Sequence, residues 1–146
     1  MTYTHKATCR FRVASWQEDL VSDIDGEGTK HGEVYYPNRG ISQARVSYTY
    51  TGDIEGTGEL VYLMGYRGGD DLVIGLERVT GSVGGHDGSF VLRHEGRHGG
   101  GAVRGTLTVV PGMGTGGLEA LRGEAELRIE GPSEDGYELV LSYDLG

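Results

Sequence analysis

Two runs decide the fold: Thr57-Gly-Glu-Leu-Val-Tyr-Leu-Met-Gly-Tyr66 and Leu72-Val-Ile-Gly-Leu-Glu-Arg-Val-Thr80. The large side chains of one face of the first run lie at alternate positions: Leu60, Tyr62, Met64 and Tyr66. This period of two is typical of a β-strand with one buried face. The turn Arg67-Gly-Gly-Asp-Asp71 joins the two runs, and such a connection predicts an antiparallel hairpin.

The same alternation recurs along the rest of the chain. Six further strands are predicted, at Ala7–Val13, Ala44–Tyr50, Ser89–Glu95, Val103–Val110, Leu121–Ile129 and Tyr137–Leu145. Glycine supplies 28 of the 146 residues, well above the usual share of about 7%, and disfavours long helices. We therefore predict an all-β chain, a single eight-stranded antiparallel up-and-down β-barrel of the lipocalin-like kind. A sandwich would also satisfy the alternation, but closure removes both unpaired edges.

One segment departs from this rhythm. Residues from Glu18 to Gln43 show little apolar periodicity and are expected to form a long loop after the first strand. Loops of this length are either functional or disordered. Tyr35 and Tyr36 could cover one mouth of the barrel as a lid, and a surface excursion is the alternative. The length of the chain favours one β-barrel domain over residues 1–146.

Charge and composition restrict the partners. Thirteen Lys and Arg against 22 Asp and Glu give a net charge of −9, which argues against nucleic-acid and anionic-membrane partners. The only cysteine, Cys9, cannot form an intrachain disulfide. The first residues lack an apolar stretch of the length of a signal-peptide core, and no apolar run in the chain reaches the length of a membrane span. A cytoplasmic location is expected. A homodimer is left open, with no exposed apolar stripe to mark its interface.

A family resemblance rests on several motifs in the order of the chain. They are Trp16 after Ala14-Ser15, Gly52-Asp-Ile-Glu-Gly-Thr-Gly58, Tyr62-Leu-Met-Gly-Tyr66, Gly75-Leu-Glu-Arg-Val-Thr-Gly81, Gly88-Ser-Phe-Val-Leu92 with His94 and Gly96, Val109-Val-Pro-Gly112, Gly114-Thr-Gly116, Leu121-Arg-Gly-Glu124 and Leu141-Ser-Tyr-Asp144. Together they resemble the bacterial domain of unknown function 3224, whose fold is similar to the allene oxide cyclase barrel. The resemblance implies an eight-stranded barrel with a central cavity, and it supplies no reaction. The segment Asp23–Gly40 looks longer than is typical of the family.

Strand alternation predicts which side chains face the barrel interior. The expected inner set is Phe11, Val13, Val46, Tyr48, Tyr50, Leu60, Tyr62, Met64, Tyr66, Phe90, Leu92, His94, Leu107, Val109, Leu139, Leu141 and Tyr143. In the run Leu72–Thr80 two faces compete. We favour the face with Gly75 and Glu77, because the other face would bury Arg78.

This choice places a carboxylate, an imidazole and several phenols around an apolar cavity. Glu77 and His94 are the predicted acid–base pair, and Tyr62 or Tyr66 is predicted to stabilise a developing oxyanion. Tyr143 is a further phenol that could do so. The predicted substrate contacts are Trp16, Tyr48, Tyr50, Met64, Phe90, Leu92, Leu107 and Tyr143. The alternative is a structural network in which Glu77 pairs with His94 or Arg78 and satisfies itself.

The sequence predicts no bound metal and no cofactor. The glycine-rich run Gly112–Gly117 lacks the βαβ context of a dinucleotide site, and Asp23–Glu27 lacks the later ligands of a calcium loop. His94 and His98 have no third ligand in register for zinc. Cys9 lies among apolar residues and is expected in the core.

Three functions fit this interior. The favoured one is a cofactor-independent cyclase or isomerase that acts on a hydrophobic, oxygenated small molecule, similar to a polyketide or an oxylipin. The second is a non-catalytic carrier or sensor of a hydrophobic ligand. The third is a barrel with a packed centre that acts through its surface.

Overall fold

The chain forms strands joined by tight turns. The computed structural model describes residues 2–131 and 133–146. The strands within these residues are β1 (His5–Asp23), β2 (Gly28–His31), β3 (Val34–Pro37), β4 (Arg39–Gly52), β5 (Ile54–Arg67), β6 (Asp71–Val83), β7 (His86–Gly99), β8 (Ala102–Val109), β9 (Thr115–Gly116), β10 (Arg122–Glu130) and β11 (Tyr137–Asp144). The described residues contain no helix long and apolar enough to span a membrane.

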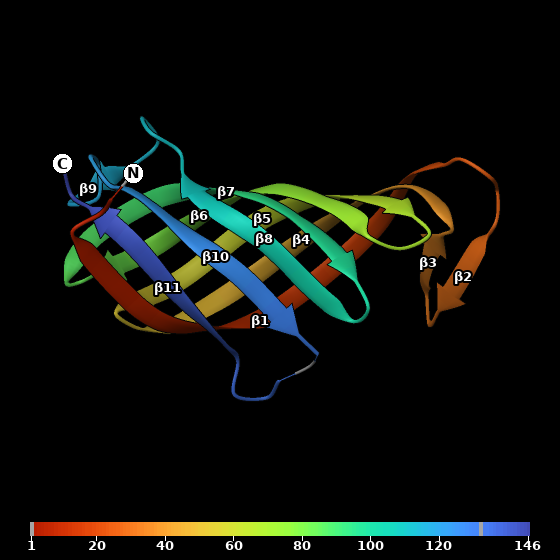
Figure 1. Ribbon diagram of the computed structural model, residues 1–146, viewed down its shortest axis with the longest axis horizontal. Coiled ribbons are helices and arrows are strands. Elements are labelled where there is room, and N and C mark those ends of the chain that lie inside the picture. Colours follow the sequence, from red (N-terminus) through yellow and green to blue (C-terminus); the bar gives the residue numbers. More distant parts are fainter. Residues whose placement is uncertain (1, 132) are drawn as a thin grey trace.

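Eight of these strands close into a barrel (Figure 1). The hydrogen-bonded order is β6-β5-β4-β1-β11-β10-β8-β7, and β7 pairs with β6 to complete the circuit. All these pairings are antiparallel. The predicted eight-stranded antiparallel barrel is therefore confirmed, and the sandwich alternative is wrong. The short β9 adds one further strand beside β7.

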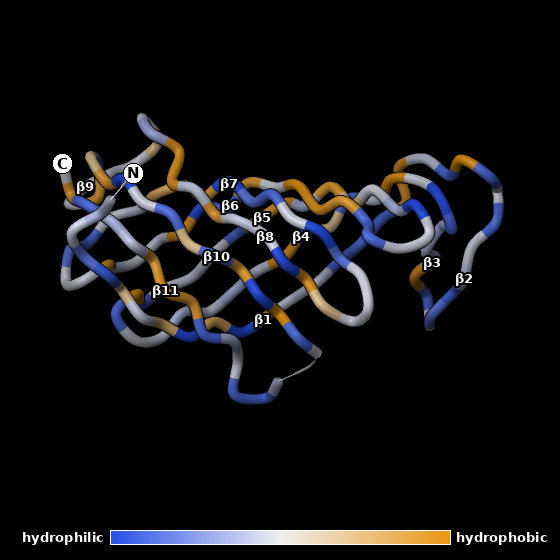
Figure 2. Tube along the Cα trace, in the orientation of Figure 1, coloured by the Kyte–Doolittle hydropathy of each residue, from blue (hydrophilic) through white to orange (hydrophobic). Residues whose placement is uncertain are grey.

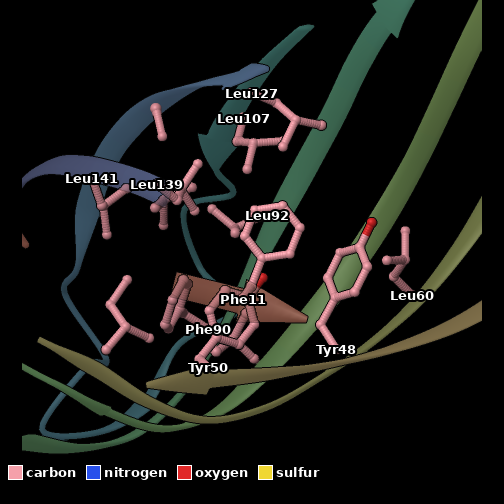
Figure 3. Close-up of a cluster of buried hydrophobic side chains, with 14 of the residues drawn as sticks. Phe11, Tyr48, Tyr50, Leu60, Phe90, Leu92, Leu107, Leu127, Leu139 and Leu141 are labelled. Carbon is pink, nitrogen blue, oxygen red and sulfur yellow. The ribbon is translucent and has the colours of Figure 1, made fainter. Parts of the chain in front are cut away.

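The barrel interior is filled by the alternating side chains. Figure 2 shows hydrophilic and hydrophobic residues following one another along β8 and β10. In Figure 3, aromatic rings and leucines from different strands converge. The Phe11 ring lies 4.9 Å from the Tyr48 ring and 6.0 Å from the Tyr50 ring, measured between centroids. Such contacts make this part of the interior a packed core.

One end of the barrel is covered by the segment between β8 and β10. Leu118 and Leu121 of this segment are buried, and β9 ties it to Gly88 and Ser89 of β7. Both termini lie at the same end (Figure 1). An opening for a ligand is therefore to be sought at the opposite end, where the β2–β3 hairpin projects.

The long loop after the first strand is shorter and more ordered than predicted. β1 continues to Asp23 and pairs there with Gly40 at the start of β4. The remaining connection contains the hairpin formed by β2 and β3. The predicted extent of the loop, Glu18 to Gln43, is thus wrong. The alternation failed as a signal here because most of β1 beyond Phe11 is exposed on both faces.

A β-bulge in β1 changes which residues face inward. The register with β4 shifts between Val13 and Ser15, and one extra residue reverses the alternation of the side chains that follow, up to a second shift between Leu20 and Ser22. Trp16 and Glu18 consequently face Val46 and Ala44 of β4. Val13 was predicted to face the interior, but its side chain is 43% exposed. The pairing of β1 with β11 ends at Phe11, so β11 does not cover Val13.

Four glycines stand side by side on neighbouring strands. Gly56 pairs with Gly81, Gly81 with Gly88, and Gly88 with Gly116 across four strands. A Cβ on Gly81 would overlap the carbonyl oxygen of Glu55, and the φ angle of Gly81 is +154°. Only glycine allows this backbone approach and this conformation. We call these four residues the glycine row.

Gly81→Ala is expected to lower the free energy of unfolding by about 3 kcal/mol, since it combines backbone strain with a steric overlap. Guanidinium denaturation followed by circular dichroism measures the loss. Gly65→Ala is the matched control on β5, because a Cβ there would meet only the side chain of Leu72, at 3.3 Å. Equal stability of the two variants would contradict the structural role of the glycine row.

An apolar cluster lies on the outer faces of β5 and β6. Val61 pairs with Leu76, and Leu63 pairs with Ile74. All four side chains are exposed. The expectation that the chain has no exposed apolar stripe is therefore wrong, because β5 and β6 carry apolar side chains on their outward faces as well as on their inward faces.

Candidate functional site

A chain of hydrogen bonds crosses the barrel interior. Tyr50 donates from its hydroxyl to Oε2 of Glu77. Oε1 of Glu77 lies 2.7 Å from Nε2 of His94, and Nδ1 of His94 lies 2.9 Å from the Tyr62 hydroxyl. The Tyr62 hydroxyl is 3.1 Å from that of Tyr48. We call these five residues the buried network.

Two glycines make room for this network. Glu77 faces inward, as the favoured parity predicted, and a Cβ on Gly58 would overlap its Oε2. Gly75 pairs with both Tyr62 and His94, and a Cβ there would lie 2.8 Å from the Tyr62 ring. The Glu77 carboxylate and the Tyr62 ring therefore occupy space that a side chain at position 58 or 75 would fill.

Burial fixes the phenols as hydrogen-bond donors. It is the main cause that raises the pKa of Tyr48, Tyr50 and Tyr62, and the charge of Glu77 adds to the increase for all three. With a proton on Nε2, His94 donates to Glu77 and accepts from Tyr62, which in turn accepts from Tyr48. Every polar group of the network then has a partner, and Glu77 receives two donors.

The network is closed to solvent. Glu77 is 0% exposed and His94 is 2% exposed, and Tyr62 is also buried. A bound molecule cannot touch Glu77 or His94 in this conformation. The fold thus brings together the two residues that were predicted to perform acid–base chemistry, but it buries both of them away from solvent.

An open pocket of about 510 Å³ lies at the mouth of the barrel. It is lined by Trp16, Glu18, His31, Tyr36, Met64, Tyr66, His98 and Val103. These residues come from β1, the β2–β3 hairpin, β5, β7 and β8. Trp16, 44% exposed, lines the pocket, and its ring centroid is 6.0 Å from that of Tyr62. One member of the buried network, Tyr62, thus lies beside a side chain that lines the mouth pocket.

Glu18 is the one carboxylate among the residues that line the mouth pocket. It is 9% exposed. Its Oε1 accepts from Nε1 of Trp16 at 3.1 Å, and its Oε2 accepts from the Tyr66 hydroxyl at 2.5 Å. Burial, followed by the bond to Glu18, raises the pKa of Tyr66, so the phenol stays a donor. Glu18 therefore fixes the orientation of two aromatic side chains of the pocket.

The β2–β3 hairpin supplies another side of the pocket. Tyr36 packs edge-on against Tyr66, with 6.1 Å between ring centroids, and His31 packs on Tyr36. Tyr35 does not line the pocket; its hydroxyl donates to Oδ2 of Asp23 at 2.6 Å, which anchors the hairpin to the end of β1. Of the two tyrosines suggested as a lid, Tyr36 occupies that place.

The predicted site residues divide into two groups. Trp16, Met64 and Tyr66 line the mouth pocket. The others are buried in the interior, at Tyr48, Tyr50, Tyr62, Glu77, Phe90, Leu92, His94, Leu107 and Tyr143. Tyr143 lies 5.4 Å from the His5 ring, close to the amino-terminal end of β1. The set is therefore not one continuous lining around one cavity.

Sequence reasoning missed five residues of the mouth pocket: Glu18, His31, Tyr36, His98 and Val103. Tyr36 was considered as a lid and His98 as a metal ligand, but neither was chosen as a contact. The spacing of Trp16 and Glu18 by two residues is a usable signal, because neighbours at i and i+2 share one face of a strand. Val103 belongs to a predicted strand and could have been found from its alternation with Leu107.

The potential metal ligands and the single thiol of the described residues form no further candidate site. Among the described residues, no group of three or more His, Cys, Asp and Glu side chains is arranged to hold a metal ion. Cys9 is buried in the core, and burial raises the pKa of its thiol to about 12. The thiol therefore remains protonated at neutral pH and is a poor nucleophile.

Comparisons with known proteins place this fold in a family. A family profile described as "Protein of unknown function (DUF3224)" matches residues 7–141. Among solved structures, the chain is similar to a protein of unknown function from the DUF3224 family of Shewanella oneidensis MR-1, with 22% sequence identity, 96% coverage of both chains and a TM-score of 0.71. That likeness concerns the fold. The comparison with curated proteins gives no match. Since the profile covers most of its length, the chain belongs to the DUF3224 family of proteins of unknown function.

Proposed function

We propose that this barrel binds a small, largely apolar molecule in the mouth pocket. The observation that carries the proposal is an open pocket of about 510 Å³, lined mainly by aromatic and apolar side chains, beside one buried carboxylate. Apolar pockets with a few placed polar groups are the usual form of small-molecule sites. Trp16 and Tyr66 are held in place by their hydrogen bonds to Glu18.

The intrinsic fluorescence of the protein reports on this pocket. Trp16 is the only tryptophan, and it lines the pocket. A panel of apolar ketones, epoxides, polyenes and lactones is titrated while Trp16 emission and thermal unfolding are recorded. A ligand at about a hundred times its dissociation constant is expected to add roughly 2.7 kcal/mol, which raises Tm by several degrees.

A filled pocket should lose this response. Val103→Phe places extra bulk in the pocket and is expected to abolish both the emission change and the increase in Tm. Val61→Phe is the matched control, because Val61 is exposed on the outer face of β5. A ligand that affects wild type and Val103→Phe equally would show that it binds elsewhere and would contradict the proposal.

A cofactor-independent cyclase or isomerase acting on a hydrophobic, oxygenated substrate is the second candidate, and it would fit the predicted likeness to the allene oxide cyclase barrel. The contact between Trp16 and Tyr62 favours it, because it connects the Glu77–His94 pair to the pocket. In this arrangement Tyr66 touches the substrate, whereas Glu77 and His94 act through Tyr62 as positioning residues.

Turnover separates the two functions. For an enzyme, mass spectrometry of a bound panel compound shows an isomeric product, and Tyr62→Phe lowers kcat with little change in KM. For a carrier or sensor, the recovered compound is unchanged and the same variant alters affinity alone.

A further inference from the structure

We propose that the ligand of the mouth pocket carries a positive charge, as a substituted or quaternary ammonium group does, and that Glu18 with the surrounding aromatic rings recognises it. This inference rests on the proposed binding function and names the chemical class of the ligand.

Glu18 has hydrogen-bond donors but no counter-charge. Trp16 and Tyr66, its partners, are both uncharged donors. Among the described residues, no Lys or Arg forms an ion pair with Glu18, although six such contacts occur elsewhere on the chain. A buried carboxylate without a cationic partner costs free energy. A cationic ligand would remove that cost on binding.

Aromatic rings surround this carboxylate on several sides. Trp16 and Tyr66 are held by Glu18 itself, and Tyr36 is packed edge-on against Tyr66. The faces of aromatic rings attract cations, and a cage of such rings is the usual site for quaternary ammonium groups. The apolar part of the ligand would lie against Met64 and Val103, which line the same pocket.

The other titratable groups of the pocket and the net charge of the chain also bear on binding of a cation. His98 lines the pocket, and its Nδ1 lies 3.9 Å from Oδ2 of Asp71, a second buried carboxylate. His31 is the remaining titratable group of the lining apart from the two tyrosines. The chain as a whole has a charge of −9, which attracts cations and repels carboxylate ligands at long range.

Three probes of similar shape test the charge. Benzyltrimethylammonium is the cation, neopentylbenzene is its uncharged isostere, and phenylacetate is the anion. Each is titrated into the full chain at about pH 8, where imidazole is ordinarily neutral, with Trp16 emission as the readout. We expect the cation to bind about tenfold or more tightly than the isostere, and phenylacetate not to bind.

Two variants locate the recognition. Glu18→Gln is expected to abolish the preference for the cation, so that the cation and the isostere bind the variant with similar affinity. Tyr36→Leu removes one ring without touching Glu18, and it should weaken binding of the cation more than binding of the isostere. Glu124→Gln is the control, because it removes one negative charge from an exposed position of β10.

The possible results are distinct. Equal affinity of the cation and the isostere in wild type, or an unchanged preference in Glu18→Gln, overturns the cation proposal and leaves the binding function standing. Tighter binding of phenylacetate overturns it in the same way. No emission change with any of these probes overturns the cation proposal, and only a flat result with the uncharged panel as well would overturn the binding function.

Discussion

Replacing His94 with leucine is expected to lower the free energy of unfolding by about 3 kcal/mol. The side chain is 2% exposed and donates to Glu77, which is fully buried. Without the imidazole, Glu77 keeps only the Tyr50 hydroxyl as a partner. Removal of the imidazole leaves one oxygen of a buried carboxylate without its donor, and the cost of keeping that oxygen away from water exceeds the loss of the contact itself.

The double variant Glu77→Leu/His94→Leu separates this cause from a packing effect. It removes the buried charge together with its partner, so it is expected to be more stable than His94→Leu alone. Guanidinium denaturation followed by circular dichroism measures all three proteins at neutral pH. If His94→Leu loses less than about 1 kcal/mol, comparable to an ordinary hydrogen bond, the buried network contributes no special stability.

Alkaline conditions are expected to unfold the barrel steeply above about pH 10. Burial raises the pKa of Tyr48, Tyr50 and Tyr62 above the ordinary value, so the folded protein keeps three protons that the unfolded chain releases from about pH 10. The folded state then binds more protons, and stability falls as pH rises. Each phenol contributes about 1.4 kcal/mol per pH unit, or roughly 4 kcal/mol for three at about pH 11.

Tyr48→Phe tests whether these phenols cause the loss. The variant has one buried phenol fewer, and above pH 10 its stability should fall less steeply than that of wild type, by about 1.4 kcal/mol per pH unit. The measurement is a series of guanidinium denaturation curves at increasing pH. Tyr3→Phe serves as the control, because Tyr3 is outside the buried network. The same slope in wild type and Tyr48→Phe would assign the loss to other groups, such as general charge repulsion.

The barrel itself could be predicted because its strands repeat one simple pattern. Alternation placed Tyr62, Glu77 and His94 on one inner surface, and the cost of burying Arg78 decided the ambiguous strand correctly. These are local properties of a strand with one apolar face. The pairing of Glu77 with His94, although foreseen as an alternative, depends on the closure of β6 against β7.

The mouth pocket could not be predicted in the same way. A single extra residue near Ala14 reverses the face on which Trp16 and Glu18 lie, and nothing in the local composition marks that bulge. The hairpin that contributes Tyr36 has exposed residues on both faces of β2, so it shows no alternation. Its position over the barrel mouth depends on Asp23 and Tyr35, a contact between residues twelve positions apart.

The glycine row bears on what relatives of this chain hold in common. Gly56, Gly81, Gly88 and Gly116 each fall within a motif that carries the family resemblance, and at each of them a Cβ would overlap a carbonyl oxygen of the neighbouring strand. The pocket residues Glu18, His31 and Tyr36 lie outside those motifs. The motifs of the resemblance therefore contain all four glycines of the row, but only Trp16, Met64 and Tyr66 among the eight residues that line the mouth pocket. A ligand found for one member should be transferred to another only where the residues at the barrel mouth also correspond.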